Sequence, residues 1–466
     1  MLFSSISFIY YFLPVMLISY FLTPRKFKNV VLLLGSLLFY FAGEPKYTVL
    51  LLISTLVDFT HSKIIVKYRG SKKAKWALIS SITLNLLMLC VFKYADFIVL
   101  NMNSIMNISI PLPNLELPIG ISFFTFQTMS YTIDVYRNEA KVQNSIIGLA
   151  TYVSLFPQLI AGPIVRYKTI SEELNNRVHS FDNFSYGIRR FIFGLGKKVL
   201  IANSLGEFAE MIYYTNDVSV LYYWITSFAY ALQIYYDFSG YSDMAIGLGR
   251  MFGFNFLENF NYPYISKSIS EFWRRWHMSL GQWFRDYVYL PLGGNRVSKL
   301  KWFRNIAIVW FLTGLWHGAS WNFVIWGSLF AVILVIEKFI LLKYLEKSKI
   351  ISHFYVVIVV TLSFVIFRND SLVEISHHFR SMFGFEGLPV FSHESIYYLK
   401  SYLVTFSIAA IGATPVGKQI ISHLRSNSVW EKIIKIVEPV ACMIILLVVT
   451  GYLVDSSFNP FLYFRF

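Results

Sequence analysis

One long stretch of this chain, between Asn305 and Glu337, contains no Lys, Arg, Asp or Glu. About 20 apolar residues suffice to cross the hydrocarbon core of a bilayer, so the stretch is predicted to cross a membrane at least once. His317 lies about eleven residues inside it, which places the imidazole roughly 16 Å deep. An ionisable group at that depth is costly and normally faces the protein interior or a water-filled cavity. His317 is therefore either a general base or a structural histidine hydrogen-bonded to a nearby carbonyl group.

The composition extends this conclusion to the whole chain. Its 466 residues are 56% hydrophobic and 14% charged, whereas a soluble domain carries about 25% charged residues. We predict an all-α polytopic membrane protein, with roughly ten to twelve transmembrane helices and with re-entrant and interfacial helices around a central cavity. The chain is predicted to form one integral-membrane domain, residues 1–466. Its predicted segments are N-terminal scaffold helices (1–118), a catalytic core (119–345) and C-terminal helices (346–466).

The net charge of +15 comes from short basic clusters between apolar stretches, such as Arg25–Lys28 and Lys67–Lys75. This pattern is typical of cytoplasmic loops under the positive-inside rule, so nucleic acid is not an expected partner. The first basic cluster follows the first apolar stretch, Phe3–Leu22, which predicts an uncleaved span with the N-terminus outside. Both cysteines lie in apolar stretches, so the sequence indicates neither a disulfide framework nor a metal–thiolate site, and no metal is expected.

The segment Ser266–Arg296 has the pattern of an amphipathic helix. At 100° per residue, seven apolar side chains fall within about a third of the helix circumference: Phe272, Trp276, Leu280, Trp283, Phe284, Tyr287 and Leu290. This predicts an interfacial helix near the cytoplasmic headgroups. Its cationic cluster of Arg274, Arg275 and Arg285 suits phosphate groups, either of a ligand or of lipids. Asp286 is expected to pair with a nearby arginine, and His277 lies at the edge of the apolar stripe.

A second polar segment, Leu232–Arg250, contains two aspartates and two serines within an otherwise helical pattern. It predicts either a hinge that lines a cavity or a helix end that is capped by Ser and Asp. Neither a GxSxG nor an HExxH motif occurs in the sequence, which argues against serine-hydrolase and zinc-protease chemistry.

The strings FWRRWHMSLGQWFRDYVYLPLGGNR and FLTGLWHGASWNFVIWG resemble the membrane-bound O-acyltransferase superfamily. More narrowly, they resemble its bacterial alginate O-acetylase and peptidoglycan O-acetyltransferase branch. Further strings fit the same branch, so the resemblance extends over nearly the whole chain: PIGISFFTFQTMSYTIDVYR, LFPQLIAGPIVR, YYDFSGYSDMAIGLGRMFGF and the terminal FNPFLYFRF.

The resemblance implies catalytic roles for His317, which matches the family's buried histidine, and for His277, which matches a second polar residue several tens of positions earlier. It implies acetyl-CoA as the acyl donor on the cytoplasmic side, with its phosphates near Arg274, Arg275 and Arg285. The acetyl group would pass to an acceptor on the outer side of a bacterial cytoplasmic membrane. There a separate extracytoplasmic acetyltransferase would complete transfer to alginate, peptidoglycan or another wall polysaccharide.

Two tryptophans in the sequence, Trp316 and Trp321, flank His317 and are expected to exclude water, which would hydrolyse a thioester. Two alternatives to acetyl transfer stay open at this point. The first is D-alanyl transfer to teichoic acid, because the proteins of that branch share the RWHMSL-type string, although their resemblance weakens after Tyr289. The second is a non-enzymatic transporter of a glycan or lipid, which would lose function only gradually on His317→Gln.

The distribution of Lys and Arg predicts the topology. The N-terminus and the loop Asn101–Pro118, which has no Lys or Arg, are expected outside, and Arg166–Arg190 is expected in the cytoplasm. Single cysteines at Asn107 and Asn176, in a background without the native cysteines, should therefore react with an impermeant thiol reagent from opposite sides of intact cells. Labelling of both positions from the same side would contradict this topology.

Overall fold

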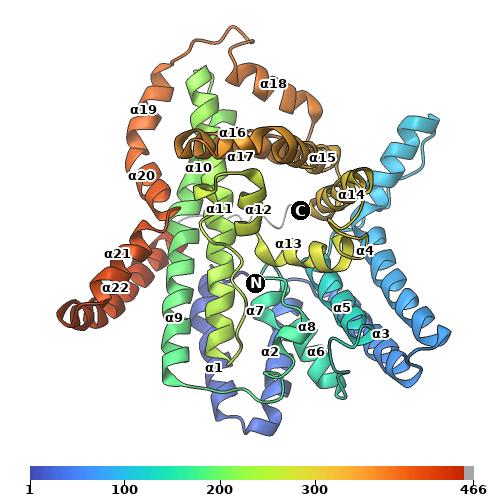
Figure 1. Ribbon diagram of the computed structural model, residues 1–466. Coiled ribbons are helices and arrows are strands. Elements are labelled where there is room, and N and C mark those ends of the chain that lie inside the picture. The colour runs from blue at the N-terminus through green and yellow to red at the C-terminus, as the bar shows by residue number, and fades with distance from the viewer. Residues whose placement is uncertain (456–466) are drawn as a thin grey trace. The chain divides into compact units, whose positions relative to one another are not determined.

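The computed structural model describes residues 1–455, and every regular element among them is a helix (Figure 1). This confirms the all-helical prediction. The terminal string FNPFLYFRF lies outside the described residues. Contacts between Cα atoms divide the chain into two compact units. Unit 1 comprises Met1–Phe191 and Tyr241–Leu257, and unit 2 comprises Ile192–Gly240 and the chain from Glu258 onwards. The units cut across the three predicted segments, so the single-domain arrangement stays a prediction.

The helices of unit 1 are α1 (Leu13–Leu22), α2 (Lys28–Phe41), α3 (Thr48–Lys67), α4 (Lys72–Met106), α5 (Ile121–Tyr136), α6 (Ile146–Ser154), α7 (Phe156–Leu159) and α8 (Tyr167–Ile170). Two helices run through both units, α9 (Phe181–Gly196) and α11 (Val220–Met251). Unit 2 adds α10 (Asn203–Glu210), α12 (Ile269–Arg275), α13 (Met278–Phe284), α14 (Lys299–His317), α15 (Trp321–Ile336), α16 (Leu342–Leu345), α17 (Lys349–Arg368), α18 (Leu372–Met382), α19 (His393–Ser401), α20 (Leu403–Gly412), α21 (Val416–Arg425) and α22 (Ser428–Asp455).

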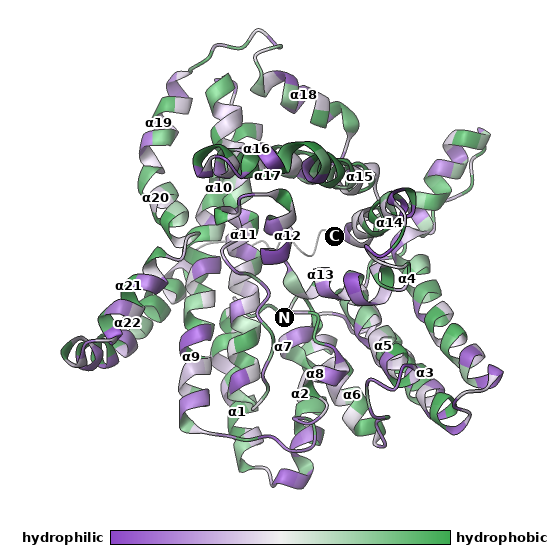
Figure 2. Cartoon of the chain, in the orientation of Figure 1, coloured by the Kyte–Doolittle hydropathy of each residue, from purple (hydrophilic) through white to green (hydrophobic). Residues whose placement is uncertain are grey.

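Five helices within residues 1–455 are long and apolar enough to cross a membrane: Thr48–Lys67, Lys72–Met106, Trp321–Leu345, Lys349–Arg368 and Ser428–Asp455. Helices α20 and α21 form a sixth candidate span if the pair, bent by 63°, is counted as one. In Figure 2 hydrophobic residues cover much of these helices. The number is lower than the predicted ten to twelve, because several apolar stretches fold into shorter helices. The stretch 146–164, for example, breaks at Leu155 and again after Leu159.

A buried polar network inside unit 1 joins α3 and α4, which belong to the predicted scaffold segment, to α5, which begins the predicted catalytic core. Asp58 is fully buried and accepts hydrogen bonds from Ser81 Oγ (2.5 Å) and from Asn85 Nδ2 (3.0 Å to each carboxylate oxygen). Asn85 Oδ1 in turn accepts from Ser54 Oγ (2.7 Å) and Thr128 Oγ1 (3.3 Å). An ionisable group within apolar surroundings needs such partners. The network therefore constrains how the three helices align.

Helix α11 is continuous through the polar segment, so neither the predicted hinge nor the predicted capped helix end occurs there. The two aspartates are neutralised by cations from the preceding helical segments instead. Within unit 2, Asp237 lies 2.6 Å from Lys198 Nζ, and both side chains are almost fully buried. Within unit 1, Asp243 lies 2.7 Å from Arg190 Nη2. Because each charge is paired inside the protein, the helix can continue without a solvated break.

The charge-free stretch that contains His317 forms two packed helices, α14 and α15, which are joined by a reversal at residues 318–320. A Cβ atom on Gly314 would lie 2.4 Å from the Phe323 carbonyl oxygen, and one on Gly327 would lie 2.3 Å from the Trp310 carbonyl oxygen. These close approaches pair earlier residues of α14 with later residues of α15, so the helices run antiparallel. Small residues at the crossing allow this close packing. His317 therefore lies at the tip of a helical hairpin rather than within an uninterrupted span.

Candidate active site

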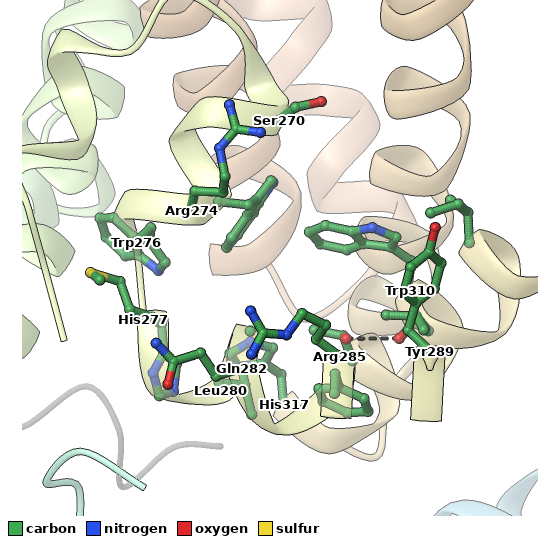
Figure 3. Close-up of a pocket in the computed structure, with 17 residues that line it drawn as sticks. Ser270, Arg274, Trp276, His277, Leu280, Gln282, Arg285, Tyr289, Trp310 and His317 are labelled. Carbon is green, nitrogen blue, oxygen red and sulfur yellow. Dashed lines mark hydrogen bonds between the residues drawn. The ribbon is translucent and has the colours of Figure 1, made fainter. Parts of the chain in front are cut away.

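Unit 2 contains a cavity of about 450 Å³ that brings together most of the predicted site residues (Figure 3). It is lined by α12, α13, α14 and the π-helical turn Arg285–Tyr289. His277, His317, Arg274 and Arg285 all contribute to its lining, whereas Arg275 does not. The two histidines are 40 positions apart in the sequence, and the fold places them on one cavity.

The segment Ser266–Arg296, which the sequence pattern predicts to be one amphipathic helix, is broken at His277. Helix α12 ends at Arg275, and α13 begins at Met278, directly after His277. His277 has a left-handed backbone conformation (φ 46°, ψ 53°), which is uncommon for a residue other than glycine and carries a cost in strain. The predicted apolar stripe is mostly buried within the protein rather than facing lipid. Five of its seven residues are at most 5% exposed: Phe272, Trp276, Leu280, Trp283 and Phe284. The break turns His277 away from the helix surface, where the sequence pattern placed it.

Asn259 determines which nitrogen of His277 carries the proton. Its side-chain oxygen accepts hydrogen bonds from the Ser279 backbone N–H (3.2 Å) and from Ser279 Oγ (2.9 Å). Because a backbone N–H can only donate, the Asn259 atom at this position is the oxygen. His277 Nδ1 lies 3.2 Å from the same oxygen and therefore donates its proton to it. The acceptor lone pair of the imidazole is then on Nε2.

His277 is 2% exposed, and the ring of Phe238 lies edge-on to it with a centroid distance of 4.7 Å. This burial lowers the pKa of His277 to about 3. Burial disfavours the charged imidazolium because the surrounding groups solvate it less well than water does. The ring is therefore neutral near pH 7, with Nε2 available as a proton acceptor.

Aromatic rings surround His317, which is 5% exposed. The rings of Trp316, Trp326 and Phe367 have their centroids 4.9, 5.1 and 5.2 Å from that of the imidazole, each in an edge-to-face arrangement. Trp316 also lies 5.8 Å from His277, so a single indole contacts both histidines. The sequence prediction of an aromatic enclosure is half correct, because Trp321 is 53% exposed and Trp326 takes the place expected for it.

The three predicted arginines do not act as one group. Arg274 and Arg285 line the cavity, and Arg285 Nε donates to Asp286 (2.7 Å), as predicted for this aspartate. Arg275 is bound instead by Glu271 (2.8 Å) and by the Asn261 carbonyl (3.1 Å), and it lines a different cavity with Lys418. Adjacent helical residues point about 100° apart, so Arg274 and Arg275 face different sides of α12.

Sequence reasoning missed three residues that complete this site. Asn259 has no recognisable motif, since its contact with His277 depends on the chain returning to the start of α13. Phe367 comes from α17, about 50 positions after His317, and nothing in the local sequence connects the two. Trp326 could have been found, because it lies in the same string as His317, but its role depends on the hairpin that folds α15 back onto α14.

Two buried imidazoles therefore lie on one cavity of a multi-pass helical protein, and neutral imidazoles are the side chains that most often move protons in enzymes. Comparison with known proteins identifies its family. Residues 47–368 match the family of membrane-bound O-acyltransferases. This chain belongs to that family and is an O-acyltransferase.

Three similar proteins cover most or all of the chain. A probable alginate O-acetylase of Azotobacter vinelandii is 40% identical over 83% of this chain and 78% of its own length. A probable alginate O-acetylase of Pseudomonas putida is 36% identical over 100% of both chains. A peptidoglycan O-acetyltransferase of Helicobacter pylori is 34% identical over 84% of this chain and 81% of its own length.

The hydrogen bond between Asn259 and His277 can be tested by substitution of Asn259. Asn259→Ala removes the acceptor that holds the proton on Nδ1, so the wrong tautomer becomes accessible. We expect kcat for acyl transfer to fall about 10²-fold with little change in KM, since tautomer control contributes to general acid–base catalysis. Ser279→Ala is the matched control, because the backbone N–H still orients the Asn259 oxygen, and its effect should be much smaller. Equal losses in the two variants would contradict the role assigned to Asn259.

Proposed function

We propose that this O-acyltransferase takes an acetyl group from acetyl-CoA on the cytoplasmic side of a bacterial inner membrane and passes it to a hydroxyl acceptor on the outer side. The observation that carries the proposal is the shared cavity, which has two buried imidazoles, His277 and His317, and two arginines, Arg274 and Arg285, in its lining. The acetyl-transferring activities named for the similar proteins support acetyl as the acyl group.

In the proposed reaction, His317 acts as the general base. The acceptor hydroxyl gives its proton to the neutral imidazole while its oxygen attacks the carbonyl carbon of the thioester. A C–O ester bond forms, the C–S bond breaks, and the departing sulfur takes the proton from His317, which returns to its neutral form. His277 assists from the donor side through Nε2. The rings of Trp316, Trp326 and Phe367 limit the access of water, which would otherwise hydrolyse the thioester.

Arg274 and Arg285 are proposed to bind the phosphates of the donor. Phosphate prefers guanidinium partners, and both arginines lie on the lining of the cavity that holds the histidines. Arg275 is left out of this proposal, although the sequence placed it with the other two, because its guanidinium is engaged by Glu271 and borders a separate cavity.

The final acceptor is proposed to be an extracytoplasmic polysaccharide, such as alginate, peptidoglycan or another wall polymer. A separate extracytoplasmic acetyltransferase is proposed to complete the transfer. The alternative of D-alanyl transfer to teichoic acid would require a carrier protein as donor. Purified protein supplied with acetyl-CoA that carries a label in its acetyl group distinguishes acetyl transfer from D-alanyl transfer. Only an acetyltransferase should consume this donor without a carrier protein.

The central test is His317→Ala. Loss of a general base typically lowers the rate about 10²–10⁴-fold, so acetyl transfer from labelled acetyl-CoA to polymer should become undetectable. Expression and the elution profile in detergent should stay as in the wild type, because His317 is at a helix end and not at the Gly314–Gly327 crossing. His277→Ala should be severe but incomplete. Near-normal transfer by His317→Ala protein at wild-type expression would overturn the proposed mechanism, and a graded loss with His317→Gln would favour a transporter.

Donor binding is tested by comparing two adjacent arginines. Arg274→Gln and Arg285→Gln should raise the KM for acetyl-CoA about 3–10-fold, since a charge-assisted contact to phosphate is worth about 1.5–3 kcal/mol and Arg285 is partly solvated. Arg275→Gln should raise it less, and Lys301→Gln, at an exposed position of the same basic stretch, should leave it unchanged. A collapsed kcat with unchanged KM in Arg285→Gln would assign that residue to chemistry rather than to donor binding.

A further inference from the structure

Unit 1 contains a cluster of basic side chains that has no carboxylate partner. Its members are Lys28 at the start of α2, Arg177 and His179 in the connection before α9, and Arg250 near the end of α11. They come from three parts of the sequence, and only the fold brings them together. We call these four residues the cation cluster. None of them forms an ion pair within residues 1–455, which distinguishes them from Arg190 and Lys198.

Tyr20 contacts three members of the cation cluster, and the fourth, Arg250, lies over the ring of Tyr186 and lines a cavity together with His179. The Tyr20 side chain is fully buried. Arg177 Nε donates to the Tyr20 hydroxyl (3.0 Å), and His179 Nε2 lies 3.2 Å from the same oxygen. Lys28 Nζ donates to the Tyr20 carbonyl (2.8 Å) and lies 4.0 Å from the centre of its ring. Neutral groups therefore hold the cations in place, and they do so without cancelling any positive charge.

Two guanidinium N–H groups of the cluster have unused hydrogen-bonding capacity. Arg177 Nη1 and Arg250 Nε are both buried and have no hydrogen-bond acceptor among the described residues. Glu173, close to Arg177 in sequence, is occupied by Asn255, which donates to it from its backbone N–H (2.9 Å) and its side-chain amide (2.5 Å). A buried donor without an acceptor is destabilising, and more so when the group is charged.

Burial and the neighbouring positive charges lower the pKa of two members of the cluster. The pKa of Lys28 is lowered by burial and by the charges of Arg177 and Arg25. The pKa of His179 is lowered by burial and by the charges of Lys28 and Arg177. Arg177 thus disfavours the charged form of Lys28, and Lys28 and Arg177 together disfavour the charged form of His179. A bound anion would reverse this penalty and would also give acceptors to the unused donors.

A cavity of about 390 Å³ opens beside the cluster. Its lining combines two residues of the cluster, His179 and Arg250, with Phe21, Phe181, Phe184 and Met251, whereas Lys28 and Arg177 lie outside the lining. Phe21 is 44% exposed and Phe181 is 83% exposed, so the apolar part of the lining leads to the protein surface. A fully hydrated small anion gains nothing from these aromatic residues. A molecule that has an anionic group joined to an apolar chain fits both parts of the lining.

We infer that the cation cluster and this cavity form a binding site for the phosphate of an anionic phospholipid, with its acyl chain along Phe21, Phe181 and Phe184. The basic stretches that contribute Lys28 and Arg177 are those predicted to face the cytoplasm, where the anionic lipids of a membrane attract basic groups. The inference does not depend on the proposed acetyl transfer, because it uses no residue of the histidine cavity.

The test uses the purified full-length protein, stripped of lipid in a neutral detergent. Phosphatidylglycerol, phosphatidylcholine of the same chain length and inorganic phosphate are added separately, and binding is followed by native mass spectrometry and by the melting temperature. Phosphatidylglycerol should bind at least about tenfold more tightly than phosphatidylcholine, given the size of charge-assisted contacts, and should raise the Tm. Inorganic phosphate at the same concentration should do neither. Equal binding of the two lipids would overturn the inference, and equal stabilisation by inorganic phosphate would overturn the assignment to a lipid.

The diagnostic variant is Arg250→Gln, which removes one charge of the cluster without breaking a hydrogen bond of the folded chain. It should weaken phosphatidylglycerol binding about tenfold. Lys72→Gln is the matched control, since Lys72 is exposed at the start of α4, and binding should stay unchanged. If Arg250→Gln protein does not fold, phosphatidylglycerol with a photoreactive acyl chain is applied to the wild type. Labelling should concentrate on the peptide that contains Phe181 and Phe184. Unchanged affinity in the folded variant, or labelling that avoids this peptide, would overturn the inference.

Discussion

The hydrogen bonds of one asparagine hold the segment around His277 in its shape. Asn259 receives two hydrogen bonds from Ser279 and one from His277, and its carbonyl oxygen accepts from the backbone N–H of Met278 (2.9 Å). These contacts maintain His277 in a left-handed conformation that would otherwise be unfavourable. They also select the tautomer. The same set of bonds therefore breaks the helix, turns the imidazole into the cavity and prepares its Nε2 to accept a proton.

The second requirement of the site is a close contact between two helices. Gly314 and Gly327 let the backbones of α14 and α15 approach so closely that no side chain would fit between them. This crossing places Trp326 against His317, which lies at the end of α14, and Phe367 completes the wall from α17. An aromatic enclosure of this kind lowers the local dielectric and limits water, and both effects favour acyl transfer over hydrolysis.

Buried charged side chains of this protein have three kinds of surroundings. Lys198 and Asp237 are buried as a pair, which allows helix α11 to continue through its polar segment. Asp58 is buried without a cation but is satisfied by hydroxyl and amide donors. The cation cluster around Tyr20 has neither a counter-charge nor enough acceptors. A buried charge without a counter-charge carries a cost, and this cost is the reason that we propose an anionic ligand for the cation cluster.

The sequence alone determined the all-helical membrane class and the family, because composition and local strings carry that information. It also proposed His277 and His317 as site residues. It further predicted that Asp286 pairs with a nearby arginine, which the structure identifies as Arg285. The tertiary structure decided what depends on contacts between distant segments. It separated Arg275 from Arg274, since neighbours on one helix face different sides, and it replaced Trp321 by Trp326 in the enclosure. A periodic pattern could not foresee the break at His277, because that break is stabilised by Asn259, which comes from outside the amphipathic segment and has no signal in the local sequence.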